Sequence, residues 1–294
     1  MTSRMTLHID HSQGQLLRSK IFGHDGVIIP FREGYIAKKC KLIRELKFYK
    51  TYVGSLHNIL EPELIPSVEG IVDDNNVHLS SSDDEVDLEV KRDIEINHKS
   101  EPYLMMHDIA DGYSRPAVLD VKLGTRTWAL GASKIKRERM KKKCSCPTSS
   151  ELCVRVRAAM WYSRTPDKWP VEENINCVKR EWGNSCSKSE FLDFLKDFFH
   201  YPNQIPIFVE KLNKLKTSMA KMREQFGARM YSSSIVFAYD EDDPSKFDCR
   251  LLDFAKTYLD IDKAAKESNE SVDECEDSVL PALNSITSMI ESLV

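Results

Sequence analysis

An aspartate and a lysine two residues apart form the most informative pair of chemical groups in the sequence. Asp120 and Lys122 lie in residues 116–124, an apolar run that begins with proline, ends with glycine and is predicted to be a strand. Side chains alternate between the two faces of a strand, so this carboxylate and this ammonium point to the same side. The carboxylate could accept from a ribose hydroxyl and the ammonium could meet a phosphate; the alternative is a surface ion pair.

Three further residues extend this pair toward nucleotide chemistry. Lys39 ends an early apolar strand and Glu45 lies in the predicted helix that follows, the arrangement with which kinase-like folds hold an ammonium over nucleotide phosphates. Asp253 ends a later apolar strand, a placement typical of an aspartate that binds Mg²⁺. Each signal alone is weak, because solvated ion pairs and strand-end aspartates are common. Together they follow the order that a two-lobed phosphotransferase requires.

A basic helix is predicted over residues 133–144. Seven Lys and Arg side chains stand there against one acid, Glu138, which gives a local charge of +6. Lys136, Arg139 and Lys143 share one face of such a helix, because residues three or four apart are neighbours. This face suits a polyanionic ligand. The alternatives are a solvated helix face and a nuclear import signal.

Composition excludes several classes of protein. The chain of 294 residues carries 42 Lys and Arg against 46 Asp and Glu, a net charge of −4, so a strongly basic nucleic-acid binder is not expected. No apolar run approaches the roughly 18 residues of a membrane span, and residues 1–11 lack the apolar core of a secretory signal. Eight scattered cysteines fit reduced thiols. We therefore expect a cytoplasmic or nuclear protein, or both, with no nucleic-acid or membrane partner.

Motifs of other nucleotide-binding classes are absent from the sequence. The chain contains no G-x-x-x-x-G-K-[ST] and no G-x-G-x-x-G, which argues against a P-loop enzyme and a Rossmann cofactor site. It also lacks the H-R-D-L-x-x-x-N and D-F-G motifs, so a protein kinase is not expected.

Periodic patterns predict the elements that position these residues. Short apolar runs separated by glycines predict antiparallel strands over residues 22–39, followed by a helix over 41–53. Residues 73–98 are rich in Asp, Glu and Ser without an aromatic residue, and are predicted to be a flexible acidic insert. Further strands are predicted at 102–106, 116–124, 234–239 and 249–252, two helices within 189–226, and a last helix near 278–293.

Residues 116–124 match PxxxDxKxG, the signature of the inositol polyphosphate kinase family, which this sequence resembles. Other blocks similar to the family occur in family order over about 230 residues. They are Gly23-His24, Lys39 with Arg44-Glu45-x-x-Phe48-Tyr49, residues 103–108, Gly124-Thr125-Arg126, residues 143–155, Tyr231-Ser232-Ser233-Ser234 and Asp253-Phe254-Ala255. Residues 142–155 and the long insert before Pro102 look more like the inositol hexakisphosphate kinase branch than like the multikinases.

This resemblance implies an α+β, protein-kinase-like fold of two lobes with ATP bound between them. The N-lobe would span residues 1–107, with an antiparallel sheet and the insert, and a larger α+β C-lobe would span residues 108–294. The implied reaction is the Mg²⁺-dependent phosphorylation of inositol hexakisphosphate by ATP to a diphosphoinositol polyphosphate, by a monomer. The alternatives are a multikinase acting on inositol tris- and tetrakisphosphates, and a non-catalytic inositol-phosphate sensor.

The resemblance also implies a role for each matching residue. Lys39 would hold the ATP phosphates, oriented by Glu45, while Met106 would meet adenine through its backbone. Asp108 and Asp120 would be candidates for the ribose, Asp253 would bind Mg²⁺ with Ser234 as a second ligand, and Ser233 is the alternative to Ser234. Lys122 would bridge the transferred phosphoryl group and the substrate. The inositol phosphates would be held by Lys136, Arg139, Lys143 and Arg155.

Four positions depart from the family pattern. His107 stands at the family's acidic position in the linker, which leaves the adenine contact to backbone groups, and Asn184 replaces an arginine after Gly183. Lys256 stands at a position where the similar block of the hexakisphosphate kinases has a histidine, and this lysine could still bind phosphate. The C-terminal block around residues 277–283 is barely similar to the family.

Overall fold

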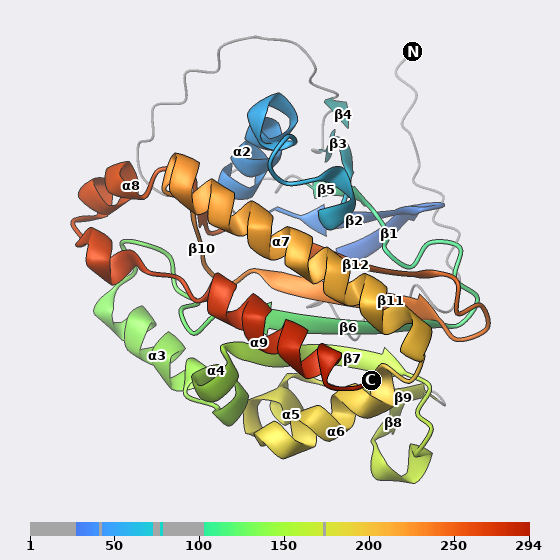
Figure 1. The fold of residues 1–294 in the computed structure, drawn as a ribbon. Coiled ribbons are helices and arrows are strands. Elements are labelled where there is room, and N and C mark those ends of the chain that lie inside the picture. The colour runs from blue at the N-terminus through green and yellow to red at the C-terminus, as the bar shows by residue number, and fades with distance from the viewer. Residues whose placement is uncertain (1–27, 41–42, 73–76, 79–102, 173–174) are drawn as a thin grey trace, which may run out of the picture.

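The computed structural model describes residues 28–40, 43–72, 77–78, 103–172 and 175–294 (Figure 1). Its strands are β1 (Ile28–Arg32), β2 (Tyr35–Lys39), β3 (Val68–Val72), β4 (Val77–His78), β5 (Tyr103–His107), β6 (Pro116–Leu123), β7 (Val154–Trp161), β8 (Val171–Glu172), β9 (Ile175–Val178), β10 (Arg229–Met230), β11 (Ser234–Asp240), β12 (Phe247–Leu252) and β13 (Thr257–Tyr258). Its α-helices are α2 (Ile43–Thr51), α3 (Lys134–Cys144), α4 (Pro147–Leu152), α5 (Arg180–Ser185), α6 (Lys188–Phe198), α7 (Ile205–Phe226), α8 (Ile261–Ser268) and α9 (Val279–Glu291). Shorter helical turns are η1 (Tyr52–Leu56), η2 (Pro62–Leu64), η3 (Pro166–Lys168), η4 (Pro202–Gln204) and η5 (Val272–Cys275).

Antiparallel pairing builds two main sheets from separate parts of the chain. Residues 28–107 supply a sheet in the order β1-β2-β5-β3-β4, which we call the N-terminal sheet. Residues 116–252 supply a larger sheet in the order β12-β11-β6-β7-β9-β8, which we call the central sheet. Antiparallel sheets combined with separate helices form the α+β class predicted from the sequence.

The N-terminal sheet starts with the hairpin expected within residues 22–39. β1 and β2 pair across a tight turn at Gly34, whose φ of 77° is a left-handed conformation that glycine adopts without a steric penalty. The helix predicted over 41–53 is α2, extended by the π-helical turn η1. Residues 22–27 of the predicted strand region lie outside the described residues.

Most of the predicted acidic insert at 73–98 also lies outside the described residues. Residues 77–78 form β4, which pairs with β3 at Ile71 and Val72. The expectation of an insert without regular structure is therefore wrong for these two residues. Strand pairing uses backbone hydrogen bonds, which an acidic composition does not reveal.

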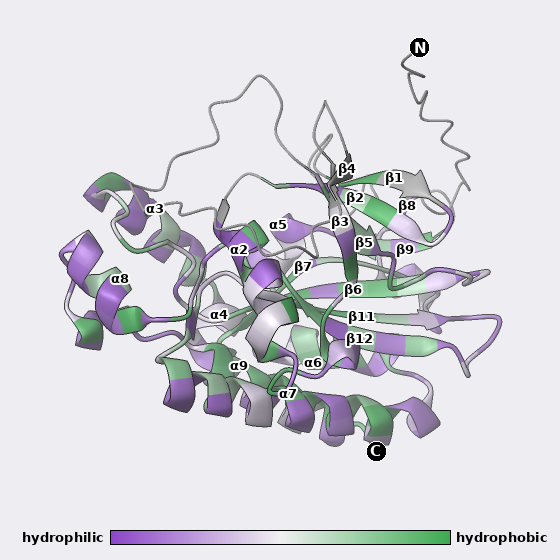
Figure 2. Cartoon of the chain, turned by 90° about the horizontal axis from the view of Figure 1, so that it is seen from above, coloured by the Kyte–Doolittle hydropathy of each residue, from purple (hydrophilic) through white to green (hydrophobic). Residues whose placement is uncertain are grey.

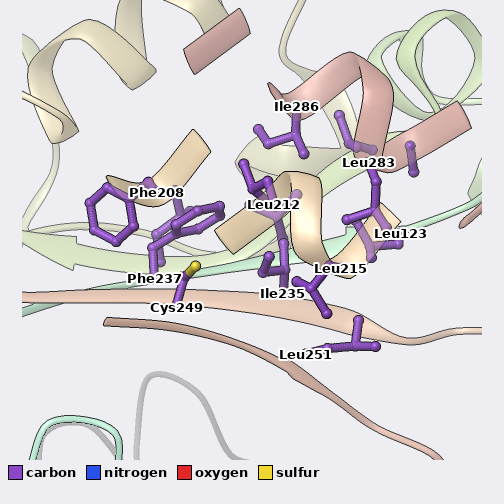
Figure 3. Packing of buried hydrophobic residues seen from close by; sticks show 14 of the residues in the cluster. Leu123, Phe208, Leu212, Leu215, Ile235, Phe237, Cys249, Leu251, Leu283 and Ile286 are labelled. Carbon is purple, nitrogen blue, oxygen red and sulfur yellow. The ribbon is translucent and has the colours of Figure 1, made fainter. Parts of the chain in front are cut away.

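The two faces of the central sheet differ in chemistry. One face packs against α7 and α9, as Figures 2 and 3 show. Its fully buried side chains are Leu119, Val121, Leu123, Ile235, Phe237, Cys249 and Leu251. Alternation leaves Asp120, Lys122 and Ser234 on the opposite face, which is turned toward the N-terminal sheet (Figure 2). We call this the polar face.

The helices under the apolar face confirm the predictions for residues 189–226 and 278–293. Ser187 begins α6 with a capping box, because its hydroxyl accepts from Glu190 N and the Glu190 carboxylate accepts from Ser187 N. η4 separates α6 from α7, and α7 ends at Gly227. α9 lies beside α7 (Figure 1). No helix among the described residues is long and apolar enough to cross a membrane.

Candidate active site

Four charged side chains meet where the N-terminal sheet faces the central sheet. Lys38 of β2 donates from Nζ to Glu45 Oε1 of α2 and to Asp253 Oδ1, at 2.7 Å in each case. The second oxygen of Asp253, Oδ2, accepts from Lys122 Nζ of β6 at 2.9 Å. Asp253 directly follows β12, so its carboxylate links one ammonium from each sheet. We call these four residues the charged joint.

The structure corrects which lysine pairs with Glu45. The sequence prediction gave this position to Lys39, but the carboxylate of Glu45 accepts from Lys38. Neighbouring side chains of a strand point to opposite faces, so only one of two consecutive lysines can face α2. Glu45 is buried and orients a lysine as predicted, and that lysine is Lys38.

Helix α2 also holds the segment that carries Asp253. Glu45 Oε1 accepts from the backbone nitrogen of Phe254, 209 residues away in the chain, at 3.2 Å. The Phe254 ring stacks on Phe48 of α2, with centroids 3.9 Å apart and an interplanar angle of 9°. Asp253 has a φ of 67°, a conformation that persists in a non-glycine residue only where its surroundings hold it. The sequence blocks around Glu45 and Asp253 thus form one unit.

The charges of the joint stabilise one another. Desolvation alone would raise the pKa of Asp253, but the ammonium groups of Lys122 and Lys38 hold that pKa well below its usual range. Burial would lower the pKa of Lys38, whereas Asp253 and Glu45 raise it well above its ordinary value. Asp253 and Lys38 therefore keep their charges near neutral pH. Fixed charges in fixed positions are the arrangement that stabilises phosphate oxygens during phosphoryl transfer.

Oxygen atoms suited to a hard cation lie beside the joint on the polar face. Ser234 pairs in register with Lys122 on one side and with Leu252, the residue before Asp253, on the other. Within the described residues, Ser234 Oγ and Asp120 Oδ1 are buried without a hydrogen-bond partner. Mg²⁺ in phosphotransfer sites takes one or two carboxylates and completes its shell with phosphates and water. Asp253, Ser234 and Asp120 fit such an ion, and Asp253 and Ser234 are the predicted metal ligands.

Three lysines from different elements come close together next to this oxygen set. Lys256, which follows β12, donates from Nζ to the Thr127 carbonyl at 2.6 Å. Burial lowers its pKa to about 8, and the charges of Lys122 and of Lys136 on α3 add to that effect. A bound polyanion would relieve this repulsion. The structure therefore gathers three of the residues predicted to bind substrate.

Helix α3 is the predicted basic helix, and one of its faces is free for a ligand. Ser133 caps it by accepting from Lys136 N at 3.3 Å. Lys136, Arg139 and Lys143 are exposed on one side of the helix. Their side chains make no hydrogen bond or ion pair to any residue that the structure describes, unlike Arg137 of the same helix, which is paired. We call these three residues the basic face.

Polar contacts rather than apolar packing hold the start of α3. Glu270, which follows the C-cap of α8, accepts from Arg126 and from Arg137 of α3, at 3.0 Å each, and from Gly131 N at 2.7 Å. The Glu270 side chain is only 3% exposed, so both ion pairs are largely shielded from water. Figures 1 and 2 both show α3 and α8 together at one end of the molecule.

A buried arginine holds the other end of α3. Arg155 of β7 donates from Nη1 to the Lys143 carbonyl, and Cys144 is the only residue that the helix buries. Arg155 pairs in register with Lys122, so it lies on the polar face. The predicted phosphate ligand Arg155 therefore also positions the end of the basic face.

Residues 103–291 match the family model described as inositol polyphosphate kinase. The chain belongs to the inositol polyphosphate kinase family. Inositol hexakisphosphate kinase 3 of Mus musculus is 28% identical over 177 residues, which cover 54% of this chain and 43% of that protein. The inositol polyphosphate multikinase of Saccharomyces cerevisiae is 26% identical over 296 residues, which cover 86% of this chain and 78% of that protein.

The chain spans less than half the length of the mouse and human hexakisphosphate kinases 3 that it matches. Among solved structures, the inositol phosphate multikinase Ipk2 of S. cerevisiae, in complex with ADP and Mn²⁺, superposes with a TM-score of 0.62. That match covers 88% of this chain and 98% of the other at 20% sequence identity, so it establishes the fold. The predicted α+β, kinase-like fold is confirmed.

The predicted adenine and ribose residues lie where the family fold crosses from one sheet to the other. Met106 is buried in β5, and Asp108 follows that strand with a side chain that accepts from Ala110 N at 3.0 Å. One oxygen of Asp108 is therefore used to shape this turn. His107 is a departure from the family pattern. Its Nε2 lies 3.9 Å from Asp111 Oδ2, and its ring packs edge-on against the ring of Tyr35.

Two of the other departures lie at α5, where Asn184 is exposed, and at the start of α9. Gly183 of α5 lies so close to β7 that an added Cβ would be 2.0 Å from the Val156 carbonyl oxygen, so only glycine fits beside Asn184. Asp277, in the poorly matching C-terminal block, accepts from Met230 N at 2.7 Å and from Val279 N at 3.1 Å. This block therefore fixes the start of α9.

Three residues at or near the site carry no prediction from the sequence. Lys38 and Lys39 are consecutive lysines at the end of one strand, so the sequence alone does not distinguish them. Arg157 of β7 had a usable signal, since it stands two residues after Arg155 and shares its face. Glu270 had none, because its partners lie more than 130 residues away in the chain.

Proposed function

We propose that this chain is an ATP-dependent kinase that transfers a phosphoryl group to an inositol phosphate. The observation that carries the proposal is the charged joint, in which Asp253 lies between an ammonium of each sheet. Phosphoryl transfer has a loose transition state, so positioning and charge neutralisation supply most of the catalysis. The charged joint supplies both the positioning and the charge neutralisation, at the place where the two sheets face each other.

ATP would lie between the two sheets. The backbone near Met106 would meet adenine, and Asp108 and Asp120 would meet the ribose. Lys38, held by Glu45, would take the phosphate-binding role that the sequence prediction gave to Lys39. Asp253 and Ser234 would hold Mg²⁺, which when bound neutralises phosphate charge.

The acceptor would lie between Lys122 and helix α3. The charges of Lys122 and Lys136 both act unfavourably on Lys256, and the basic face adds Arg139 and Lys143. A ligand with phosphates on several sides would meet all of these cations at once. Lys122 would bridge the transferred group and the acceptor, because it alone belongs to both the joint and this cation cluster.

We favour inositol hexakisphosphate as the acceptor. A phosphate acceptor is already ionised and needs no general base, and the +6 charge of α3 matches the ligand with the most phosphates. The similarity to hexakisphosphate kinases supports this choice. The product would be a diphosphoinositol polyphosphate.

One observation favours a second candidate, a multikinase that phosphorylates a hydroxyl of an inositol tris- or tetrakisphosphate. Asp120 has an unpartnered buried oxygen, and burial raises its pKa, which moves the group toward the range of a general base. The similarity to the yeast multikinase extends over more of this chain. Asp120→Asn would then abolish turnover, whereas with a phosphate acceptor it would mainly raise the KM for ATP.

Incubation with MgATP and a panel of inositol phosphates, with products separated by charge, tests the proposal. A product more highly charged than the hexakisphosphate is the expected result. Products from tris- and tetrakisphosphates alone would establish the multikinase instead. Binding of inositol phosphates without any product would show a non-catalytic sensor and overturn the proposal.

A further inference from the structure

An irregularity in β7 lies directly opposite Asp120. β6 and β7 are paired in register from Val118 to Asp120, which faces Ala158, but the next pair is Val121 with Val156. Arg157 is therefore an extra residue on β7, which is a β-bulge. Bulges of this kind are frequent next to active sites, where they redirect a side chain.

The bulge places two consecutive side chains on the polar face. Val156 and Ala159 belong to the core beneath the sheet, whereas Ala158 packs with Val118 and Val236 of the opposite face. Two residues separate Val156 from Ala159, and a regular strand would turn only one of them away from the core. Arg157 therefore shares the polar face with Ala158.

Arg157 is charged but has no bonded partner among the described residues. Its side chain is partly exposed and makes no hydrogen bond or ion pair within the described ranges. Its charge acts on the buried carboxylate of Asp120, together with that of Lys122. Arg155, the next residue on this face of β7, is by contrast buried and bonded to the end of α3.

The strand order separates Arg157 from the nucleotide phosphates. β12 and β11, which carry Asp253 and Ser234, lie on one side of β6, and β7 lies on the other. Three strand spacings of about 4.8 Å put roughly 14 Å between β12 and β7. Arg157 is thus on the same side of Lys122 as Arg155 and helix α3, which is the acceptor side of the proposed site.

We propose that Arg157 binds a phosphate of the inositol phosphate acceptor, in addition to the phosphates held by the basic face of α3. The inference rests on the proposed function and adds to it a contact that none of the sequence motifs contains. A cation separate from the basic face would discriminate by the number of phosphates, because a sparsely phosphorylated ring could satisfy the basic face and leave Arg157 without a partner. Arg157 would then favour highly phosphorylated acceptors.

Titration of inositol hexakisphosphate into the full chain tests this inference without requiring turnover. Arg157→Gln is expected to weaken binding about tenfold, the usual size of one charge-assisted contact. Arg157→Lys should recover part of the loss. The control is Lys221→Gln, which removes the same charge from α7 beneath the apolar face. The same variants are then assayed for the KM of ATP, and their thermal midpoints are compared with that of the unmodified chain.

Each other outcome overturns the inference. Unchanged affinity in Arg157→Gln would show that the arginine does not touch the acceptor. A rise in the KM for ATP alone would show that it acts through Asp120 on the nucleotide. Equal weakening by Lys221→Gln would show a general charge effect. If the unmodified chain binds no inositol phosphate, the proposed function fails and the inference fails with it. If the unmodified chain binds the hexakisphosphate and Arg157→Gln binds it equally well, only the inference fails.

Discussion

In the charged joint every charged side chain has a partner of opposite sign, whereas the three cations of the basic face have none among the described residues. Asp253 accepts from Lys38 and Lys122, and Lys38 is shared with Glu45. The basic face is exposed on a helix that buries only Cys144. The joint is therefore organised before any ligand binds, while the helix carries charge that only a ligand neutralises. Removing a charge from the joint should affect catalysis, and removing charge from the helix should affect affinity.

The largest effect is expected from Lys122, which belongs to both regions. Lys122→Ala removes the ammonium that contacts Asp253 and that, in the proposed function, would bridge to the acceptor. We therefore expect kcat to fall by roughly a thousandfold, the scale of losing one preorganised charge from a transition state. Binding of ATP should remain within a few fold, because Lys38 and Glu45 stay in place. Steady-state rates and ATP titration measure the two quantities. A variant with near-normal kcat would contradict the assignment of Lys122.

The next largest effect is expected from the basic face. Neutralising Lys136, Arg139 and Lys143 together to glutamine should raise the KM for inositol hexakisphosphate by about a hundredfold, as the loss of several charge-assisted contacts predicts. The KM for ATP should not change. Lys134, Lys141 and Lys142 lie on the same helix outside this face, so their triple glutamine variant is a charge-matched control. Equal effects of the two triple variants would show that the helix acts only through its total charge.

A smaller effect is expected where the helix is held. Glu270→Gln removes the charge that fixes Arg137 and Arg126, so the basic face would shift relative to Lys122. The KM for the acceptor should rise about threefold to tenfold, with kcat and the KM for ATP unchanged, as for the loss of one buried ionic contact. Glu267→Gln is the matched control, since Glu267 is exposed near the end of α8, shortly before Glu270 in the chain. If both variants behave alike, the contact with Glu270 has no part in positioning α3.

The smallest effect concerns the proton on Lys256. Burial and the neighbouring cations lower its pKa to about 8 from the ordinary 10.5, so the free protein holds this lysine partly neutral at pH 8.5. A polyanion raises the pKa of the lysine, so binding should take up as much as about 0.75 of a proton there. Calorimetry in buffers of different ionisation enthalpy measures this uptake, and Lys256→Met should lose it. Equal uptake by the variant would place the proton on another group.

The same pKa shift affects folding, with a defined sign. Between pH 8 and pH 10.5 the unfolded chain binds more protons at Lys256 than the folded chain does. The contribution of this lysine to stability is therefore unfavourable below that window and is relieved as the pH rises through it. Lys256→Met should remove this part of the pH dependence from the thermal midpoint.

The elements that carry the site could be predicted from the sequence because their signals are local. The apolar run of β6 determines where Asp120 and Lys122 lie, and the seven cations of α3 mark a helix that cannot be buried. The residues 44–49 and 253–255 were recognised as separate blocks, but nothing in their spacing shows that Phe48 and Phe254 stack. Contacts between distant segments depend on how the sheets pack, which one sequence does not contain.

The errors and omissions have the same origin. Lys38 and Lys39 are chemically identical, and the choice between them depends on which face of β2 packs toward α2. The bulge at Arg157 depends on the partner strand, and a period of two extended through β7 would place Ala158 in the core. β4 forms because β3 offers an edge, although its surroundings in the sequence are acidic.

Separate titrations of MgATP and of inositol hexakisphosphate into two variants test the division between the joint and the helix most directly. Lys38→Met alters the nucleotide side of the joint, and the triple glutamine variant at Lys136, Arg139 and Lys143 alters the basic face. We predict that Lys38→Met loses affinity for MgATP and keeps its affinity for the hexakisphosphate, and that the triple variant does the reverse. The account would be contradicted if both variants lost affinity for the same ligand, or if neither variant lost affinity for either ligand.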